Sequence, residues 1–505
     1  MADCKEANTK HDDFDKSYNH ILKYTGLFGG IQGLTVLISV LRNKLVAILI
    51  GSAGMGLVDI YSRTIDLLAN ATNLGIPFSA VKRVSELYEK EDWDGLKGYI
   101  GVVRTWSLLT ALLGMFACCL FSPLISYLTF KDFSFISVFC TLSPMVAMVA
   151  IGGGELAILK GVRRLKKIAL ITILGALATL LITIPIYLFL GAHGIVPVLV
   201  FCCFALTAIQ VYHSTRIYPW CKKDFSFSFL KKGRSMVKLG ISYILAGIAG
   251  SGAEMIIRTY MYNKGSLSDV GLYAAGFIVC VTYSRLIFVA MDADYYPRLS
   301  GVASDVGKMN KVVNQQMEVC MLLASPLLIF FMMTLPFMIP LLYRADFISV
   351  IPMALCASFY LYFKSLASPI AYLSLAKGDS FTYFIVEFFY DIIFVVLVII
   401  CYANWGLVGS GVALSLSNLF DLLLVSVVYS VKYKFRFSLH VLGKALLQII
   451  LIISAWLLAW YMQGWTKYML GALLLAVSGG YSFYILNKET TLLSFIKNKL
   501  KRRKR

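Results

Sequence analysis

Charged side chains are scarce in this 505-residue chain, and so are the polar stretches in which a soluble protein carries them. Asp, Glu, Lys and Arg make up 15% of the residues, and the mean hydropathy is +0.76. A typical soluble domain is about 25% charged, so water does not surround most of this molecule. The composition excludes a soluble globular protein and predicts one embedded in lipid.

The chain also lacks the signatures of enzymes that use nucleotides, metals or a nucleophilic serine. It contains no G-x-S-x-G sequence and no nucleotide-binding motif, and its 5 histidines lack metal-ligand spacing. The glycine-rich stretch Gly51 to Gly56 lacks the Lys-Ser/Thr ending of a phosphate-binding loop, and we interpret it as a tight turn. We therefore expect a protein that is not an enzyme and needs no cofactor.

About fourteen apolar stretches run through the sequence, each near the length of about 20 residues that one membrane helix requires. We expect these helices at residues 24–50, 57–78, 99–121, 134–159, 168–190, 194–213, 239–262, 271–291, 317–342, 347–376, 381–401, 406–430, 441–462 and 468–486. Several gaps are too short to hold a folded domain, so the function is expected within the membrane. The predicted fold class is an all-α polytopic membrane protein.

Basic residues are distributed unevenly between the gaps. Most of the 47 Lys and Arg residues lie in the two termini and in every second gap, and the other gaps hold only Lys131, Lys264, Arg344 and Lys467. By the positive-inside rule, both termini are predicted to be cytoplasmic. The net charge of +20 thus reflects membrane topology, and no nucleic-acid partner is expected.

A weak internal repeat divides the chain into two halves. Gly56-Leu57 and Gly271-Leu272 open two predicted helices, and Arg83-Val84-Ser85 and Arg298-Leu299-Ser300 follow at identical separations. Two pseudo-symmetric lobes of six helices with the same orientation would produce this repeat, and chance is the alternative. We expect an N-terminal arm with an interfacial helix at 1–23, an N-lobe at 24–213, a cytoplasmic linker at 214–238, a C-lobe at 239–430, two further helices at 441–486, and a basic cytoplasmic tail at 487–505 that contacts membrane lipids.

Basic residues inside the predicted helices are candidates for a site, because each costs about 2.5 to 3.5 kcal/mol to insert. Arg42 and Lys44 have no acid within a turn, so they either face a wet cavity or extend toward the outer surface. Arg285 and Lys364 also lack a local partner. A shared central cavity lined by cations explains all four, and it predicts an anionic substrate such as a diphosphate.

Other intramembrane charges come with acids nearby. Asp59, Arg63 and Asp66 share one helix face, and Glu254 lies one turn before Arg258, so each set is either functional or simply self-neutralising. The candidate substrate-binding residues are thus Arg42, Lys44, Arg63, Arg258, Arg285 and Lys364.

Two carboxylates, Glu387 and Asp391, lie one turn apart on a single helix face. Their repulsion in a medium of low dielectric constant suits a site that carries a proton or a sodium ion. The alternative is a structural salt bridge to Lys364 or to a neighbouring helix.

The sequence resembles the Wzx-type polysaccharide transporters of the multidrug/oligosaccharidyl-lipid/polysaccharide (MOP) exporter superfamily. The resemblance is most specific in the first two helices, in the stretches Leu41-Arg42-Asn43-Lys44-Leu45-Val46-Ala47-Ile48-Leu49-Ile50-Gly51, Gly54-x-Gly56-Leu57, Leu74-Gly75-Ile76-Pro77 and Val81-Lys82-Arg83. It implies a flippase that moves undecaprenyl-diphosphate-linked oligosaccharide, an O-antigen or capsule unit, to the periplasmic leaflet of the bacterial plasma membrane. It also implies coupling to H⁺ or Na⁺.

The resemblance adds roles for particular residues. Arg42 and Lys44, inside the matched motif, would hold diphosphate or acidic sugar. Some superfamily members carry a cation site in the C-lobe, which makes Glu254, Glu387 and Asp391 coupling candidates. Arg83 and Arg298 would form a cytoplasmic gate, for which topological anchoring is the alternative. We expect a monomer whose partners are the lipid-linked oligosaccharide, membrane lipids and, as a candidate, a glycan polymerase.

Two other functions fit the same composition. A drug or metabolite extruder of this architecture would be expected to carry acids rather than several unpaired bases in its cavity. A membrane-embedded polysaccharide polymerase or ligase would need a sizeable outward loop or a catalytic His/Asp arrangement, and the sequence shows neither.

Overall fold

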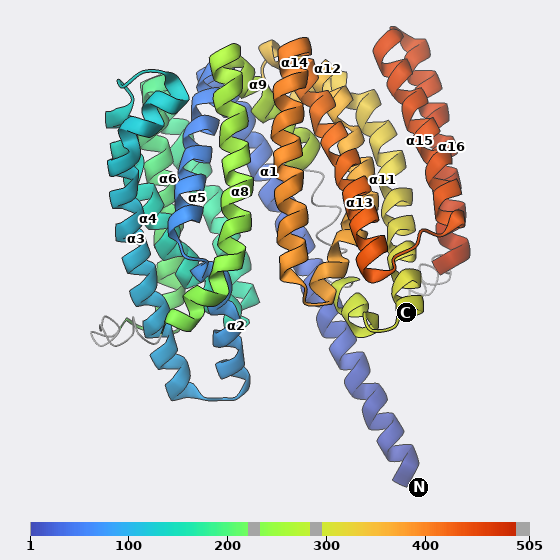
Figure 1. The fold of residues 1–505 in the computed structure, drawn as a ribbon, viewed down its shortest axis with the longest axis horizontal. Helices are drawn as coiled ribbons and strands as arrows, with labels where there is room; N and C mark the ends of the chain where they lie inside the picture. The colour runs from blue at the N-terminus through green and yellow to red at the C-terminus, as the bar shows by residue number, and fades with distance from the viewer. Residues whose placement is uncertain (1, 221–232, 283–294, 491–505) are drawn as a thin grey trace.

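The computed structural model describes residues 2–220, 233–282 and 295–490, and every regular element in these ranges is helical. The helices form one elongated bundle in which they run side by side (Figure 1). The elements are α1 (Ala2–Thr72), α2 (Ile76–Glu89), α3 (Trp93–Phe130), α4 (Ile136–Gly161), α5 (Leu165–Leu190), η1 (Gly191–Gly194), α6 (Ile195–Thr215), α8 (Arg234–Lys264), α9 (Leu267–Phe277), η3 (Ile278–Thr282), α11 (Val306–Leu342), η4 (Ala345–Ser349), α12 (Val350–Ala357), α13 (Phe359–Ala376), α14 (Ser380–Tyr433), α15 (Leu439–Tyr461) and α16 (Trp465–Thr490).

Three apolar stretches are too long for one crossing, at 40, 51 and 54 residues. Each is interrupted by one glycine with positive φ: Gly51 (66°), Gly191 (52°) and Gly406 (54°). Residues with a Cβ rarely adopt this backbone conformation, so glycine is required at each break. The turn predicted at 51–56, and the gap that the predicted helices leave at 402–405, are therefore shorter than expected, because a single glycine bends the chain while its neighbours remain helical.

The two halves of α14 fold back on each other around Gly406. Near the turn, a Cβ on Gly409 would lie 1.9 Å from the carbonyl oxygen of Cys401. Further away, Asn418 donates to the Tyr390 hydroxyl (3.3 Å). These contacts are in antiparallel register, so α14 supplies two crossings. When each stretch interrupted by a glycine is counted as two crossings, the described helices match the predicted crossings. The exception is the 271–291 segment, part of which lies outside the described residues.

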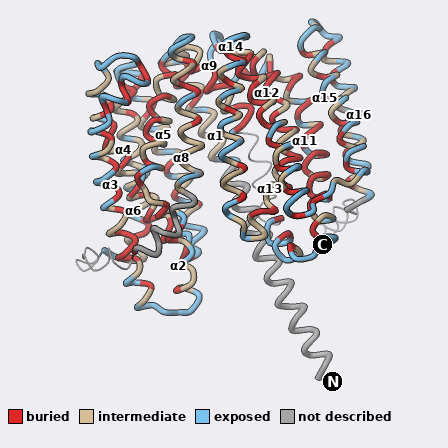
Figure 2. The backbone as a smooth tube through the Cα atoms, in the orientation of Figure 1, coloured by how far each residue is buried: buried red, intermediate tan, exposed pale blue. Residues whose placement is uncertain are grey.

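Figure 2 shows buried backbone in the interior and exposed backbone around the outside. The exposed positions include many large apolar side chains, for example Phe189 (88% exposed), Leu181 (69%) and Phe116 (68%). An apolar surface of this extent is stable only against lipid. The protein is therefore a multi-pass membrane protein, and the predicted fold class is confirmed.

The breaks at Gly51 and Gly406 lie at one end of the bundle, which we call the hairpin end, because residues beside both contact the start of α9: the Ser52 hydroxyl lies 2.6 Å from that of Ser268, and the Tyr402 hydroxyl donates to Asp269 Oδ2 (3.1 Å). Here α1 of the predicted N-lobe and α9 of the predicted C-lobe touch through small residues. A Cβ on Gly56 would lie 2.1 Å from the Leu267 carbonyl oxygen, and a Cβ on Gly271 would lie 1.9 Å from that of Ser52. The two glycines of the predicted repeat thus meet reciprocally, and they hold the hairpin end closed.

Replacing Gly56 with Leu should separate the lobes at the hairpin end, because no side chain fits against the Leu267 backbone. Oxidative cross-linking of a Ser52→Cys/Ser268→Cys variant measures this separation. We expect efficient cross-linking in the parent and at least a several-fold loss with Gly56→Leu. Gly443→Leu is the matched control, since its Cβ meets nothing within 4 Å. Equal cross-linking in all three proteins would show that the glycines do not close this end.

Candidate functional site

A buried ion cluster joins the two lobes below the hairpin end. Arg258 of α8 is 1% exposed, and its Nε donates to Asp59 Oδ2 of α1 at 2.7 Å. Its Nη1 contacts the Glu254 carboxylate one turn earlier on α8 and donates to the Glu254 carbonyl oxygen (3.1 Å). The guanidinium carbon lies 5.1 Å from the ring centre of Tyr273 and 5.5 Å from that of Phe277. Arg258 thus remains charged inside the protein because two carboxylates and two aromatic faces replace its water.

Asp59 is shared with a second arginine. Arg63 Nε lies 3.4 Å from Asp59 Oδ1, and Arg63 Nη1 lies 3.9 Å from Asp66 Oδ2. The self-neutralising interpretation of this helix face therefore describes the observed contacts. The same is true of Glu254 with Arg258. In this conformation Arg258 is held by acids.

A cavity of about 490 Å³, here called the central cavity, brings together four of the predicted site residues: Arg63, Glu254, Lys364 and Glu387. A volume of this size is typical of ligand sites. Tyr360, Tyr372 and Tyr383 also line it. The cavity is therefore lined by two of the predicted bases and also by two acids.

Lys364 has a partner that local sequence did not reveal. Its Nζ lies 3.2 Å from Asp421 Oδ2 of α14, and 5.6 Å from the ring centre of Tyr390. Lys364 therefore lacks a local partner, as the sequence indicates, but has a distant one. The pairing was missed because Asp421 is 57 residues away in the sequence and is brought close by the α14 hairpin.

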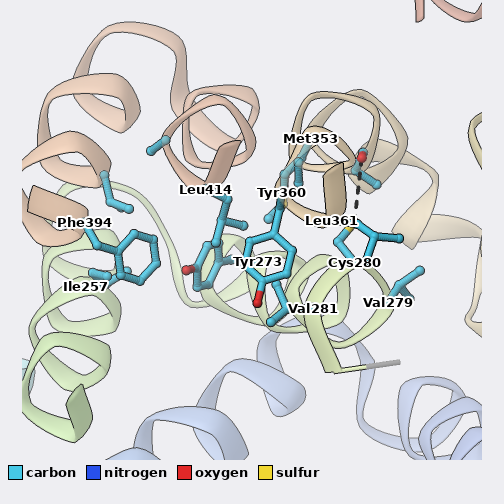
Figure 3. Packing of buried hydrophobic residues seen from close by; sticks show 14 of the residues in the cluster. Ile257, Tyr273, Val279, Cys280, Val281, Met353, Tyr360, Leu361, Phe394 and Leu414 are labelled. Atoms are coloured by element: carbon cyan, nitrogen blue, oxygen red, sulfur yellow. Dashed lines mark hydrogen bonds between the residues drawn. The ribbon is translucent and has the colours of Figure 1, made fainter. Parts of the chain in front are cut away.

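A second cavity of about 220 Å³, here called the carboxylate cavity, is lined by Glu254 and Asp391. It adjoins the central cavity, since Glu254, Phe277, Val281 and Tyr360 line both. Figure 3 shows the surrounding packing, in which Phe394, Tyr360 and Leu414 come together from α13 and α14. Glu387 and Asp391 thus point into different cavities, although they share one helix face. Among the described residues, neither carboxylate forms an ion pair or a hydrogen bond.

Two predicted substrate residues lie elsewhere. The half-buried Arg42 donates to Asn43 Oδ1 (3.2 Å) and lies near Tyr187 and Cys202 of α5 and α6. Neither Arg42 nor the half-buried Lys44 is among the described residues that line the two cavities. Their convergence with Lys364 is not observed here. Arg285 lies outside the described residues.

The predicted gate residues are separated in this structure. Arg83 of α2 pairs with Glu86 (2.9 Å) on the surface. Arg298 is exposed and donates to Gln316 Oε1 of α11 (2.9 Å). Each arginine is thus bound within its own lobe.

Sequence reasoning missed the tyrosines and one ion pair. Tyr360 precedes Lys364 by one helical turn, and Tyr383 precedes Glu387 by the same distance, so i, i+4 spacing from a buried charge was an available signal. Arg104 of α3 and Glu155 of α4, both 2% exposed, form a two-point pair (2.9 and 3.2 Å) outside the two cavities. We interpret this pair as structural.

A family model described as "Polysaccharide biosynthesis protein" matches residues 21–302, more than half of the chain. The chain belongs to this family. A search of curated proteins gives no match. The membership of the polysaccharide biosynthesis family confirms the resemblance found in the first two helices, which lie within the matched range.

Solved transporters share the fold of this family member. The lipid II flippase MurJ, in an inward closed conformation, aligns with a TM-score of 0.68 and 14% identity, covering 92% of this chain and 99% of MurJ. An inward-facing multidrug resistance MATE family transporter of the MOP superfamily aligns with a TM-score of 0.67 and 14% identity, covering 79% and 94%. A MOP superfamily transporter from Pyrococcus furiosus aligns at 0.58 with 13% identity, covering 82% and 96%. The chain thus has the same overall fold as these solved proteins.

Asp59→Asn should destabilise the protein by about 3 to 5 kcal/mol, because it leaves the buried Arg258 with one carboxylate partner fewer. Thermal unfolding in detergent measures this loss. Asp66→Asn is the control on the same helix, and it should change stability by less than about 1 kcal/mol because Asp66 is 53% exposed and weakly paired. Equal losses in the two variants would contradict the assignment of Asp59 as the partner of Arg258.

Proposed function

We propose that this protein is a flippase for lipid-linked oligosaccharides that carry a diphosphate. The observation that supports this most directly is the central cavity, where Arg63 and Lys364 lie beside three tyrosines. Basic side chains suit phosphate oxygens, and aromatic faces suit sugar rings. Membership of the polysaccharide biosynthesis family supports the same class of cargo.

The cargo would enter as an anion that competes with carboxylates already present. Lys364 is held by Asp421, and Arg63 by Asp59, until a diphosphate provides stronger contacts. The sugar-diphosphate head would occupy the central cavity, and the polyprenyl chain would remain in lipid. Arg42, Lys44, Arg258 and Arg285 are proposed to contact the cargo in other conformations of the cycle.

Coupling is assigned to the carboxylates. Asp391 and Glu254 line the carboxylate cavity, and Glu254 also contacts Arg258. A proton or Na⁺ that neutralises Glu254 would weaken its attraction for Arg258 and so loosen the ion cluster between the lobes. Glu387, which lines the central cavity, would couple binding of the cargo to binding of the ion.

The direction of transport follows from the charge distribution. We assign the hairpin end to the periplasm and both termini to the cytoplasm of a bacterial inner membrane, because the predicted loops at the hairpin end are poor in basic residues. A closed hairpin end then corresponds to an inward-facing state. Arg83 and Arg298 would approach each other when the cytoplasmic end closes. The protein is proposed to act as a monomer that supplies a glycan polymerase.

Lys364→Gln should reduce transport of lipid-linked oligosaccharide at least about 10-fold, because a charge-assisted contact to diphosphate is lost. A leaflet-resolved assay of the lipid-linked glycan in a deletion strain measures this. Lys308→Ala, on the exposed start of α11, is the control and should transport normally.

Lys364→Gln also leaves Asp421 unpaired, so the double variant Lys364→Gln/Asp421→Asn separates folding from function. It should recover thermal stability but not transport. Transport at the parent rate by this double variant would exclude Lys364 as a cargo contact.

Asp391→Asn should abolish the response of transport to an imposed ion gradient, since the carboxylate cavity loses an ionisable group. Proteoliposomes with a H⁺ or a Na⁺ gradient, tested separately, measure the response. Transport without a gradient should persist. A full gradient response in both Asp391→Asn and Glu387→Gln would contradict the assignment of coupling to these residues.

A drug or metabolite extruder is the second candidate, because Glu254, Glu387 and Asp391 also suit an organic cation. The MATE-type fold supports it equally. Extrusion of a cationic dye with normal surface glycan in the deletion strain would favour this function over the flippase.

A further inference from the structure

An apolar groove of about 590 Å³, here called the interlobe groove, lies between the lobes and separate from the two cavities. It begins near the middle of the bundle and ends at the hairpin end. Along α8 it extends from Gly252 to Lys264, a helical distance of about 18 Å. Its walls come from four helices and consist mainly of Leu67, Leu68, Leu124, Ile125, Leu128, Met255, Ile256 and Ile399.

Two lysines stand at the mouth of this groove. Lys131 ends α3 in a left-handed conformation (φ 56°), and Lys264 is the last residue of α8. Both are exposed and line the groove. Among the described residues, neither forms an ion pair with an acid, and the Lys131 Nζ lies 5.3 Å from the ring centre of the exposed Tyr127.

This placement is unusual, because the predicted loops at the hairpin end hold only four basic residues. The other two are already engaged. Arg344 lies 3.8 Å from Asp346, and Lys467 is buried and donates to the Ala459 carbonyl oxygen (3.1 Å). Lys131 and Lys264, which have no carboxylate partner, are thus the two that flank the interlobe groove. The groove is about as deep as half a bilayer.

We propose that the interlobe groove binds one anionic phospholipid from the leaflet at the hairpin end. An acyl chain lies along the apolar walls, and the headgroup phosphate lies between Lys131 and Lys264. Charge complementarity selects an anionic lipid over a zwitterionic one. The groove also suits the length of an acyl chain in one leaflet.

Binding here has a conformational consequence. The groove is shared by α3 of the N-lobe and α8 of the C-lobe, which are joined at its mouth by a hydrogen bond from Asn263 Nδ2 to the Thr129 carbonyl oxygen (3.1 Å). A lipid that contacts both lobes binds only when they are adjacent. It therefore favours the state in which the hairpin end is closed.

Native mass spectrometry of the full chain with phosphatidylglycerol or phosphatidylcholine tests this site. We expect preferential retention of phosphatidylglycerol, and about 30-fold weaker retention by Lys131→Ala/Lys264→Ala, the equivalent of about 2 kcal/mol for two surface lysines. Arg344→Ala is the matched control and should retain lipid like the parent. Equal retention of phosphatidylglycerol by the parent and the double lysine variant would overturn the proposal.

A second variant tests the apolar part of the site while both lysines remain. Ile256→Trp should fill the groove and reduce retention, whereas Ile453→Trp, at a lipid-facing position on α15, should not. Preferential retention of undecaprenyl diphosphate over phosphatidylglycerol would overturn the assignment to a phospholipid. In that case the interlobe groove would bind a polyprenyl lipid and not a phospholipid.

Cross-linking of Ser52→Cys/Ser268→Cys measures the conformational effect without any glycan. Added phosphatidylglycerol should raise the cross-linking yield several-fold, and the two lysine substitutions should remove the increase. A yield that does not respond to phosphatidylglycerol would overturn the proposed effect on closure, whatever the transported substrate is.

Discussion

The structure depends on one buried charge that both lobes share. Arg258 cannot be stable at the centre of a membrane protein unless acids surround it, and one of those acids, Asp59, belongs to the other lobe. Contact between the lobes is therefore held by a charge pair as well as by close packing. A purely apolar interface would be insensitive to ions, whereas the proposed coupling requires that this one weaken when a nearby carboxylate gains a proton or a cation.

Glu254 connects the parts of the site. It contacts Arg258, lines the carboxylate cavity with Asp391, and lines the central cavity with Lys364. In the proposed cycle, this one side chain thus belongs to the cargo site, to the coupling-ion site and to the contact between the lobes. No long pathway between these sites is therefore needed. The reciprocal glycines at the hairpin end complement this arrangement, because backbone contact there is rigid and either formed or broken.

The fold was largely predictable, and the site only in part. Apolar length located the helices, and the glycine-rich stretch near Gly51 located a turn. Individual charged residues that line the cavities, such as Lys364 and Asp391, were identifiable as candidates, because charges inside membrane helices are rare and costly. Their partners were not, since Lys364 meets Asp421, and Arg258 meets Asp59, only through packing between distant segments.

The sequence by itself determined that the chain crosses a membrane many times, which residues carry charge inside it, and where glycine permits the backbone to turn. These properties follow from local composition, and they do not depend on which helices are neighbours. Only the tertiary structure decided which charges neutralise each other and which line a cavity. Glu387 and Asp391 show the reason: they are one turn apart on one helix, yet they line different cavities, because each cavity is formed by side chains from several distant segments.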